Sequence, residues 1–378
     1  MKKYFLPLLS LIILGCQEKA VEQERKENLN ALEYLKNEMK KQGIPATQIA
    51  VIKDSEVVLS KTLGFANVPF SVKANDSTLF SINSIGKIFT STAIMQLVEQ
   101  DKIKLSDKIS EHLKNLPNTW NSVTVENLLS HTSGLPSIED PITEELIGHR
   151  GIKKAWELVK KLPVQFEPKD QFDYNATNYL LLYKLIEKCS GVPYQNFVKQ
   201  NQFDVAGMER IYFQNSSDVF ENKSPTYSFY HQNKNTGEYE EKENLTELND
   251  YFPKELTTDS GAYTTADEMA KWILALLNNK LLIDKESLGI MWEPIKLNNG
   301  TYDGIGENLN AYALGWPIVK REKHSAIAPF GGGRACIFIY PKENLSIILN
   351  TNLMGSYPNR IVDNISKFYL NEESGSKN

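Results

Sequence analysis

Ser84 and Lys87 stand three residues apart in the stretch Phe80-Ser-Ile-Asn-Ser-Ile-Gly-Lys-Ile-Phe-Thr90. Residues at positions i and i+3 share one face of a helix, so a helix that begins near Ser84 brings its hydroxyl close to the Lys87 amine. A serine alcohol becomes a nucleophile when a nearby base takes its proton. Lysine can be that base when burial, neighbouring cations or a helix N-terminus lower its pKa from about 10.4. The spacing therefore indicates an acyl-transferring serine hydrolase, although chance also produces such pairs.

The N-terminus has the layout of a secretory signal, with a basic start, a short apolar core and a small residue before Cys16. The apolar core is too short to span a membrane. Residues 13–16, Ile-Leu-Gly-Cys, resemble the bacterial lipobox, in which the cysteine is diacylated and becomes the new N-terminus. We expect residues 1–15 to be a lipoprotein signal peptide and Cys16 to anchor the protein to the bacterial cell envelope, periplasmic or at the cell surface. A plain signal cleaved elsewhere, or an uncleaved anchor, is the alternative.

The net charge and the cysteine count argue against a nucleic-acid-binding protein and against a disulfide-rich domain. Cleavage before Cys16 removes two lysines and takes the formal net charge from -5 to -7, which does not favour nucleic acid as a partner. Only Cys189 and Cys336 remain, too few for a disulfide framework. The five histidines show no ligand spacing with each other or with the cysteines, so we expect no metal site and no cofactor.

The order of apolar patterns predicts a mixed fold. A polar tether at residues 16–27 precedes an amphipathic helix with Leu29 and Met39 on its apolar face. The predicted elements that follow are a hairpin around Asp54-Ser55, a helix from Ser84 to about Gln100, a mainly helical stretch at about 106–275 with a hairpin near 226–249, strands at 311–319, 335–340 and 345–350, and a closing helix at 359–369.

Early and late strands around a helical middle predict an α/β (α+β) fold whose antiparallel sheet is built from both chain ends, with an inserted helical lobe. We place this domain at residues 28–370, followed by a flexible tail at 371–378.

Several stretches, taken in order, resemble the serine β-lactamase and penicillin-binding-protein-like superfamily, in its class C β-lactamase, DD-peptidase and esterase branch. The similarity covers about residues 30–370. The stretches that carry it are residues 80–90, Leu128-Leu-Ser-His-Thr-Ser-Gly-Leu-Pro136, Phe172-Asp-Tyr-Asn-Ala-Thr-Asn-Tyr179, Ser260-Gly-Ala-Tyr-Thr-Thr-Ala-Asp267, Leu314-Gly-Trp316 and Gly331-Gly332.

This resemblance implies a β-lactamase/DD-peptidase-like fold with Ser84 as nucleophile, Lys87 as its proton partner and Tyr174 as the tyrosine of the Tyr-x-Asn motif. A phenol could act as base or relay if Lys87 stabilises its anion. His131 is structural in relatives, and a Ser-His-Asp arrangement through His131 is the weaker alternative. The N–H of Gly332 could be the second oxyanion donor, or residues 331–333 could be a glycine bulge before a strand.

Two departures from the motifs put the substrate in doubt. Ala176 stands where the family has asparagine, and Asn175 or Asn178 could replace it only at a different spacing. Pro329-Phe330-Gly331 aligns with the Lys-Thr-Gly or His-x-Gly motif, so the cation and hydroxyl that help hold a substrate carboxylate in relatives are absent. We expect weak recognition of β-lactams and of D-Ala-D-Ala peptides, and an apolar pocket at Phe330.

The leading hypothesis is a cell-envelope serine hydrolase of esterase or amidase type that cleaves a small-molecule ester, an amide or a peptide through a Ser84 acyl-enzyme. A non-catalytic homologue that binds a peptide or glycan is the second hypothesis, motivated by Ala176 and Pro329-Phe330. A β-lactamase or DD-carboxypeptidase is the third.

Overall fold

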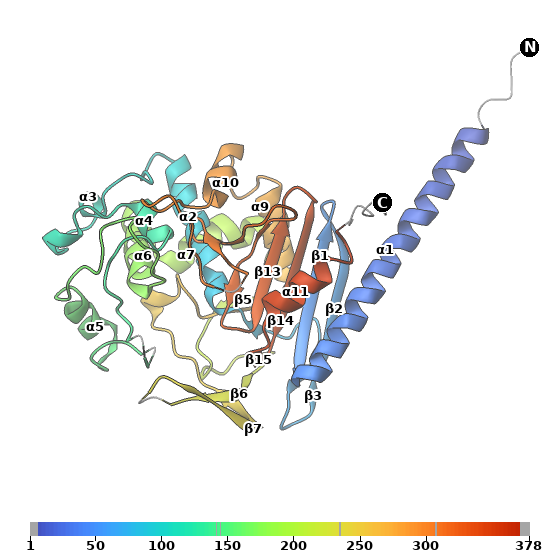
Figure 1. The fold of residues 1–378 in the computed structure, drawn as a ribbon, viewed down its shortest axis with the longest axis horizontal. Helices are drawn as coiled ribbons and strands as arrows, with labels where there is room; N and C mark the ends of the chain where they lie inside the picture. Colours follow the sequence, from blue (N-terminus) through green and yellow to red (C-terminus); the bar gives the residue numbers. More distant parts are fainter. Residues whose placement is uncertain (1–6, 141, 144, 234–235, 307, 371–378) are drawn as a thin grey trace, which may run out of the picture.

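The computed structural model describes residues 7–140, 142–143, 145–233, 236–306 and 308–370, and the side chains of residues 7–20 are outside this description. The predicted tail at 371–378 and the first six residues of the predicted signal lie outside it as well. Figure 1 shows a body of sheet and helices from which one long helix projects.

The main sheet joins both ends of the chain, as predicted. Its central pairs are antiparallel, with Ala50 opposite Ile348 and Ile337 opposite Ile348. The strands follow the order β3 (Val72–Lys73), β2 (Glu56–Asn67), β1 (Ala46–Lys53), β14 (Leu345–Thr351), β13 (Ala335–Tyr340), β11 (Ala326–Ile327), β10 (Pro317–Val319), β9 (Ala311–Tyr312), and β12 (Phe330–Gly331) pairs with β13.

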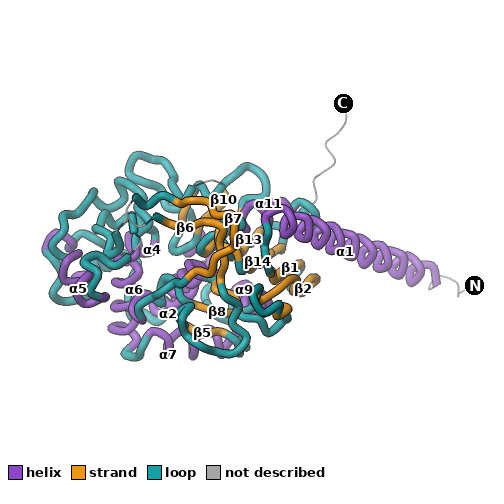
Figure 2. The backbone as a smooth tube through the Cα atoms, turned by 90° about the horizontal axis from the view of Figure 1, so that it is seen from below, coloured by secondary structure: helices purple, strands orange, loops and turns teal. Residues whose placement is uncertain are grey.

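Both faces of the sheet are covered, which explains why β13 is apolar at nearly every position. Ile337 and Ile339 face the helical lobe, whereas Phe338 and Tyr340 face α1 (Pro7–Gln42) and α11 (Pro358–Ser366). Figures 1 and 2 show the sheet between these two groups of helices.

Most of the remaining helices form a lobe against one face of the sheet, and their segments lie between the early and the late strands, as predicted. Apolar residues of α2, α6 and α9 form the larger core cluster with one face of the sheet. The helices are α2 (Lys87–Glu99), α3 (Ile109–His112), α4 (Val125–Leu129), α5 (Gly151–Val159), α6 (Ala176–Ser190), α7 (Tyr194–Val198), α8 (Asp204–Ala206), α9 (Ala266–Leu277) and α10 (Lys285–Trp292), with shorter turns η1 (Asn83–Gly86), η2 (Asn118–Trp120), η3 (Lys199–Phe203) and η4 (Lys254–Leu256).

Two small sheets accompany the main sheet. The predicted hairpin near 226–249 is present as β6 and β7. The first small sheet has the order β15 (Leu353–Met354), β6 (Thr226–Gln232), β7 (Tyr239–Leu248), and the second has the order β4 (Phe80–Ser81), β8 (Ala262–Thr264), β5 (Ile211–Phe213).

Two predicted boundaries differ from the structure. Residues 311–319 form two antiparallel strands, β9 and β10, because Gly315 at φ 86° turns the chain between them. The helix expected near Leu29 begins at Pro7, so α1 includes the stretch predicted as a polar tether. Within the part of the chain that the structure describes, no helix has the length and apolar content needed to cross a membrane.

Candidate active site

Ser84 lies in the 3-10 turn η1 between strand β4 and helix α2. Its neighbour Asn83 has φ 43°, a left-handed conformation that asparagine tolerates better than most residues. The Ser81 hydroxyl donates a 2.6 Å hydrogen bond to Oδ1 of Asn83 and holds this turn. The predicted helix therefore begins three residues after Ser84, and the 3-10 turn places the serine at its entrance.

Lys87 begins α2 and is 2 % exposed. Its Nζ lies 3.4 Å from Oγ of Ser84, so the structure brings the predicted pair together. The same Nζ lies 4.5 Å from the ring centroid of Tyr174 and 4.9 Å from that of Tyr179. Cation–π contacts of this kind stabilise an ammonium group.

Asp259, which is partly buried, forms an ion pair with the buried Lys87, and no motif in the sequence points to this residue. The carboxylate comes from the segment between η4 and β8, 172 residues away in sequence. Its backbone is fixed because the Asp259 N–H donates to the carbonyl of Leu256 at 3.0 Å. The neighbouring Thr258 carbonyl accepts a 2.6 Å hydrogen bond from the Thr90 hydroxyl on α2.

Tyr174 lies beside the nucleophile, and 41 % of its surface is exposed. The protein atoms packed around its hydroxyl nevertheless raise the pKa of Tyr174 well above its ordinary value by desolvation, and the negative charge of Asp259 raises it further. A hydrogen bond with the Ser84 side chain opposes this shift of the pKa. At neutral pH the Tyr174 hydroxyl is therefore a neutral phenol and a proton donor.

The residues next to Tyr174 serve the fold. Ala176 is the first residue of α6 and presents no polar side-chain group. Asn175 is its N-cap: Oδ1 accepts from the Thr177 N–H at 2.8 Å, and Nδ2 donates to the carbonyl of Leu135. Asn178 is also buried and committed, since its Oδ1 accepts from the Ser133 hydroxyl at 2.6 Å. These bonds leave neither amide available to replace the missing asparagine, so we do not retain Asn175 as a substrate ligand.

His131 has no exposed surface and packs beside Tyr174, with ring centroids 4.4 Å apart. Its Nδ1 accepts from the Asn175 N–H and from Nδ2 of Asn178, both at 3.1 Å. Burial, together with the positive charge of Lys87, lowers the pKa of His131 well below its ordinary value. The imidazole is therefore neutral, and its bonds support the Tyr174 segment.

Gly331 ends strand β12, and Gly332 and Gly333 form a tight turn that leads into β13. The Arg334 N–H donates to the carbonyl of Gly331 at 3.0 Å, and Gly332 and Gly333 have φ of 53° and 62°. A Cβ added to Gly331 would lie 1.9 Å from the carbonyl oxygen of Ile82, and one added to Gly332 would lie 2.4 Å from Nδ2 of Asn83. The turn therefore packs directly against the nucleophile segment, where its backbone N–H groups can meet an acyl oxygen.

A cavity of about 1030 Å³ adjoins this turn. Phe330 and Gly332 line it, together with Arg334, a residue outside the motifs that resemble the family. Arg334 is 2 % exposed, and its Nη1 pairs with Oδ2 of Asp250 at 2.8 Å. The cavity thus contains a cation three residues after Gly331, but a carboxylate already balances its charge.

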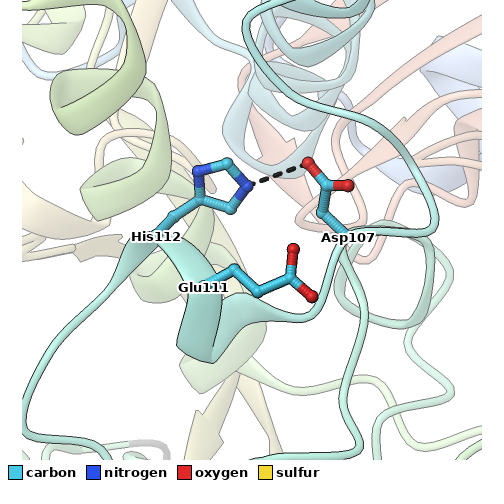
Figure 3. Close-up of side chains that lie close together, drawn as sticks. All are labelled: Asp107, Glu111 and His112. Carbon is cyan, nitrogen blue, oxygen red and sulfur yellow. Dashed lines mark hydrogen bonds and ion pairs between the residues drawn. The ribbon is translucent and has the colours of Figure 1, made fainter.

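Potential metal ligands gather elsewhere. Among the described residues, Asp107, Glu111 and His112 form one group whose ligand atoms lie within 4.8 Å of one another (Figure 3). Nε2 of His112 lies 2.9 Å from Oδ2 of Asp107, and this ion pair accounts for the contact between them. Glu111 and His112 belong to α3 and Asp107 precedes it (Figure 3), and we assign the group no part in the chemistry.

Comparison with known proteins supports the same fold. A family model described as Beta-lactamase matches residues 32–372. Protein flp of Staphylococcus aureus is 24 % identical over 349 residues, which are 90 % of this chain and 66 % of that protein. The putative penicillin-binding protein PbpX of Bacillus subtilis is 27 % identical over 267 residues, which are 70 % of this chain and 62 % of that protein. The chain thus spans less than two thirds of the length of these relatives.

Solved structures agree. The octameric penicillin-binding protein homologue from Pyrococcus abyssi has a TM-score of 0.70 at 25 % identity, covering 88 % of this chain and 75 % of that one. The D-amino acid amidase from Ochrobactrum anthropi SV3, complexed with L-phenylalanine amide, has a TM-score of 0.77 and covers 90 % and 98 %. Its 20 % identity shows the fold alone.

Proposed function

This chain belongs to the Beta-lactamase family, whose model matches residues 32–372, and on that premise we propose that it is a serine hydrolase that forms an acyl-enzyme on Ser84. One observation carries the proposal. Ser84 Oγ lies 3.4 Å from Nζ of the buried Lys87, with Tyr174 against the same amine. A nucleophile, a proton carrier and a phenol at one point are the groups that acyl transfer requires.

The reaction begins when Ser84 Oγ bonds to the carbonyl carbon of the substrate and its proton passes to Lys87. The bond to the leaving alcohol or amine then breaks, and the neutral Tyr174 phenol is placed to supply the proton that this group takes up and to regain one from Lys87. The N–H groups of Ser84 and Gly332 are the candidates for holding the oxyanion. Water cleaves the acyl-enzyme and releases an acid.

The acyl group that we propose is uncharged, which favours esterase or amidase chemistry over β-lactam hydrolysis. Pro329 and Phe330 carry neither cation nor hydroxyl, and Phe330 lines the cavity. The one guanidinium on the cavity wall, Arg334, already pairs with Asp250. A substrate carboxylate would therefore have to displace an existing ion pair.

The test combines two activity probes with the purified protein and its Ser84→Ala variant. We expect a fluorescent fluorophosphonate to label the wild type and not Ser84→Ala, and a fluorescent penicillin to label neither. Labelling by penicillin would favour a β-lactamase or DD-carboxypeptidase. Absence of both labels from a protein that melts cooperatively would favour a non-catalytic binding protein.

We also propose that the protein is anchored to the bacterial cell envelope through Cys16. The lipobox-like residues 13–16 and the projection of α1 away from the body support this placement (Figure 1). In cells fed radioactive palmitate, the wild type is expected to take up label and to sediment with membranes. A Cys16→Ala variant that still took up label would contradict the anchor.

A further inference from the structure

The groups around Lys87 decide where the proton of Ser84 can go during the reaction. The side chain is 2 % exposed and is enclosed by the Asp259 carboxylate and the faces of Tyr174 and Tyr179. These contacts favour a positive charge at Nζ and place a carboxylate directly beside it. A proton that leaves Ser84 for Nζ therefore has a second acceptor within reach.

The tyrosines and the histidine around Lys87 are not available to accept the proton of Ser84. Burial raises the pKa of Tyr174, Tyr179 and Tyr312 well above their ordinary values, so all three are neutral phenols. His131 is neutral, but its Nδ1 already accepts two hydrogen bonds within the fold. Among the described side chains that face Lys87, the Asp259 carboxylate, which is paired with Nζ, is the proton acceptor that remains.

We propose that Asp259 is a positioning residue of the hydrolase that acts through Lys87 and holds the proton of Ser84 during attack. This inference rests on the proposed function. As Ser84 Oγ bonds to the substrate, its proton moves to Nζ of Lys87, and one of the three protons of Lys87 moves to the Asp259 carboxylate. Lys87 remains an ammonium, Asp259 becomes a neutral acid, and the negative charge resides on the substrate oxyanion.

Contacts with neighbouring elements hold the backbone around Asp259 in position. Its backbone lies against the entrance of α2, since a Cβ added to Gly86 would lie 3.6 Å from the carbonyl oxygen of Asp259. The preceding residue is fixed from two helices, because the Thr258 hydroxyl donates to the carbonyl of Tyr179 at 3.0 Å and its own carbonyl accepts from Thr90. A carboxylate held this firmly needs little reorganisation when the proton moves.

Ala176 stands where the resembled family has an asparagine. It begins α6 without a polar side chain, so it offers Lys87 no amide partner. Asp259 supplies a partner from another segment, and this partner carries a charge that an amide lacks.

The test is the pH dependence of the rate at which a fluorophosphonate labels Ser84. We expect Asp259→Asn to lose about 100-fold in rate near neutral pH, the usual range for a lost proton acceptor. The rate should recover as the pH rises, because hydroxide can then take the proton that residue 259 no longer accepts, so the profile moves to alkaline pH. Asp101→Asn is the matched control, because Asp101 is exposed, carries the same charge and has φ 54°, which asparagine accepts.

Two results would overturn the inference. A loss by the same factor at every pH would mean that Asp259 only supports the fold, and faster labelling at neutral pH would mean that it only restrains Lys87. If Asp259→Asn does not fold, Asp259→Glu decides: a profile at the wild-type position supports the inference, and an alkaline displacement refutes it because the charge is still present. A folded wild type that takes up no label at any pH refutes the proposed function instead.

Discussion

Replacing Gly331 with alanine tests whether the glycine turn sets the position of the nucleophile. The new Cβ would lie 1.9 Å from the carbonyl oxygen of Ile82, whereas real Cβ contacts stay beyond 3.0 Å. Strand β12 and turn η1 must therefore separate by about 1.1 Å, and both sides of this contact are backbone that cannot rotate away. We expect Gly331→Ala to lower the free energy of unfolding by about 3 kcal/mol, the upper end for overpacking. A displacement of about 1 Å near the reacting groups also costs roughly 100-fold in rate.

The measurements are urea unfolding and the rate of fluorophosphonate labelling. Gly289→Ala is the matched control, because Gly289 lies in α10 with nothing within 4 Å of an added Cβ. This control should gain roughly 0.5 to 1 kcal/mol of stability and keep the wild-type labelling rate. If Gly331→Ala behaves like Gly289→Ala in both assays, the close packing of the turn against Ile82 does not control the site.

Two further changes test the surroundings of the site. Asp250→Ala leaves the buried Arg334 without its carboxylate, and urea unfolding should show that the free energy of unfolding falls by about 3 kcal/mol. This is the low end for a broken buried ion pair, because Asp250 is 23 % exposed. A loss below about 1 kcal/mol would mean that the pair behaves like an ion pair at the surface. The folded protein binds a proton at His131 only well below the ordinary pKa of 6.5, so the unfolded chain gains that proton first as the pH falls. The resulting stability is present above about pH 6.5 and is lost below it at up to roughly 1.4 kcal/mol per pH unit, and His131→Phe should flatten this slope between pH 6.5 and 5; equal slopes in both proteins would refute the assignment.

Features that depend on neighbouring residues were predictable from the sequence. Ser84 and Lys87 lie one helical turn apart, so their contact follows once a helix begins nearby. The hairpin at Asp54-Ser55 is equally local, since both residues have positive φ in a tight turn. The fold class followed from the positions of apolar strands at both chain ends.

Features that depend on distant residues were not predictable in this way. Asp259 meets Lys87 across 172 residues, and no spacing in the sequence signals the pair. Arg334 stands close to Gly331 in sequence, but its role depends on Asp250, which arrives from another loop. The residue missing from a motif was visible at Ala176, whereas the residue that replaces its contact required the fold.

The pairing of β1 with β14 decides when the main sheet can be completed during synthesis. The Thr47 hydroxyl donates to the carbonyl of Asn350, 303 residues later, so β1 leaves the ribosome long before its partner exists. At about 5 to 20 residues per second this interval is roughly 15 to 60 s. The turn at Gly331 that supports Ser84 also belongs to the late strands. Nascent chains that stop before β14 therefore carry Ser84 without the main sheet and without the glycine turn that packs against its segment.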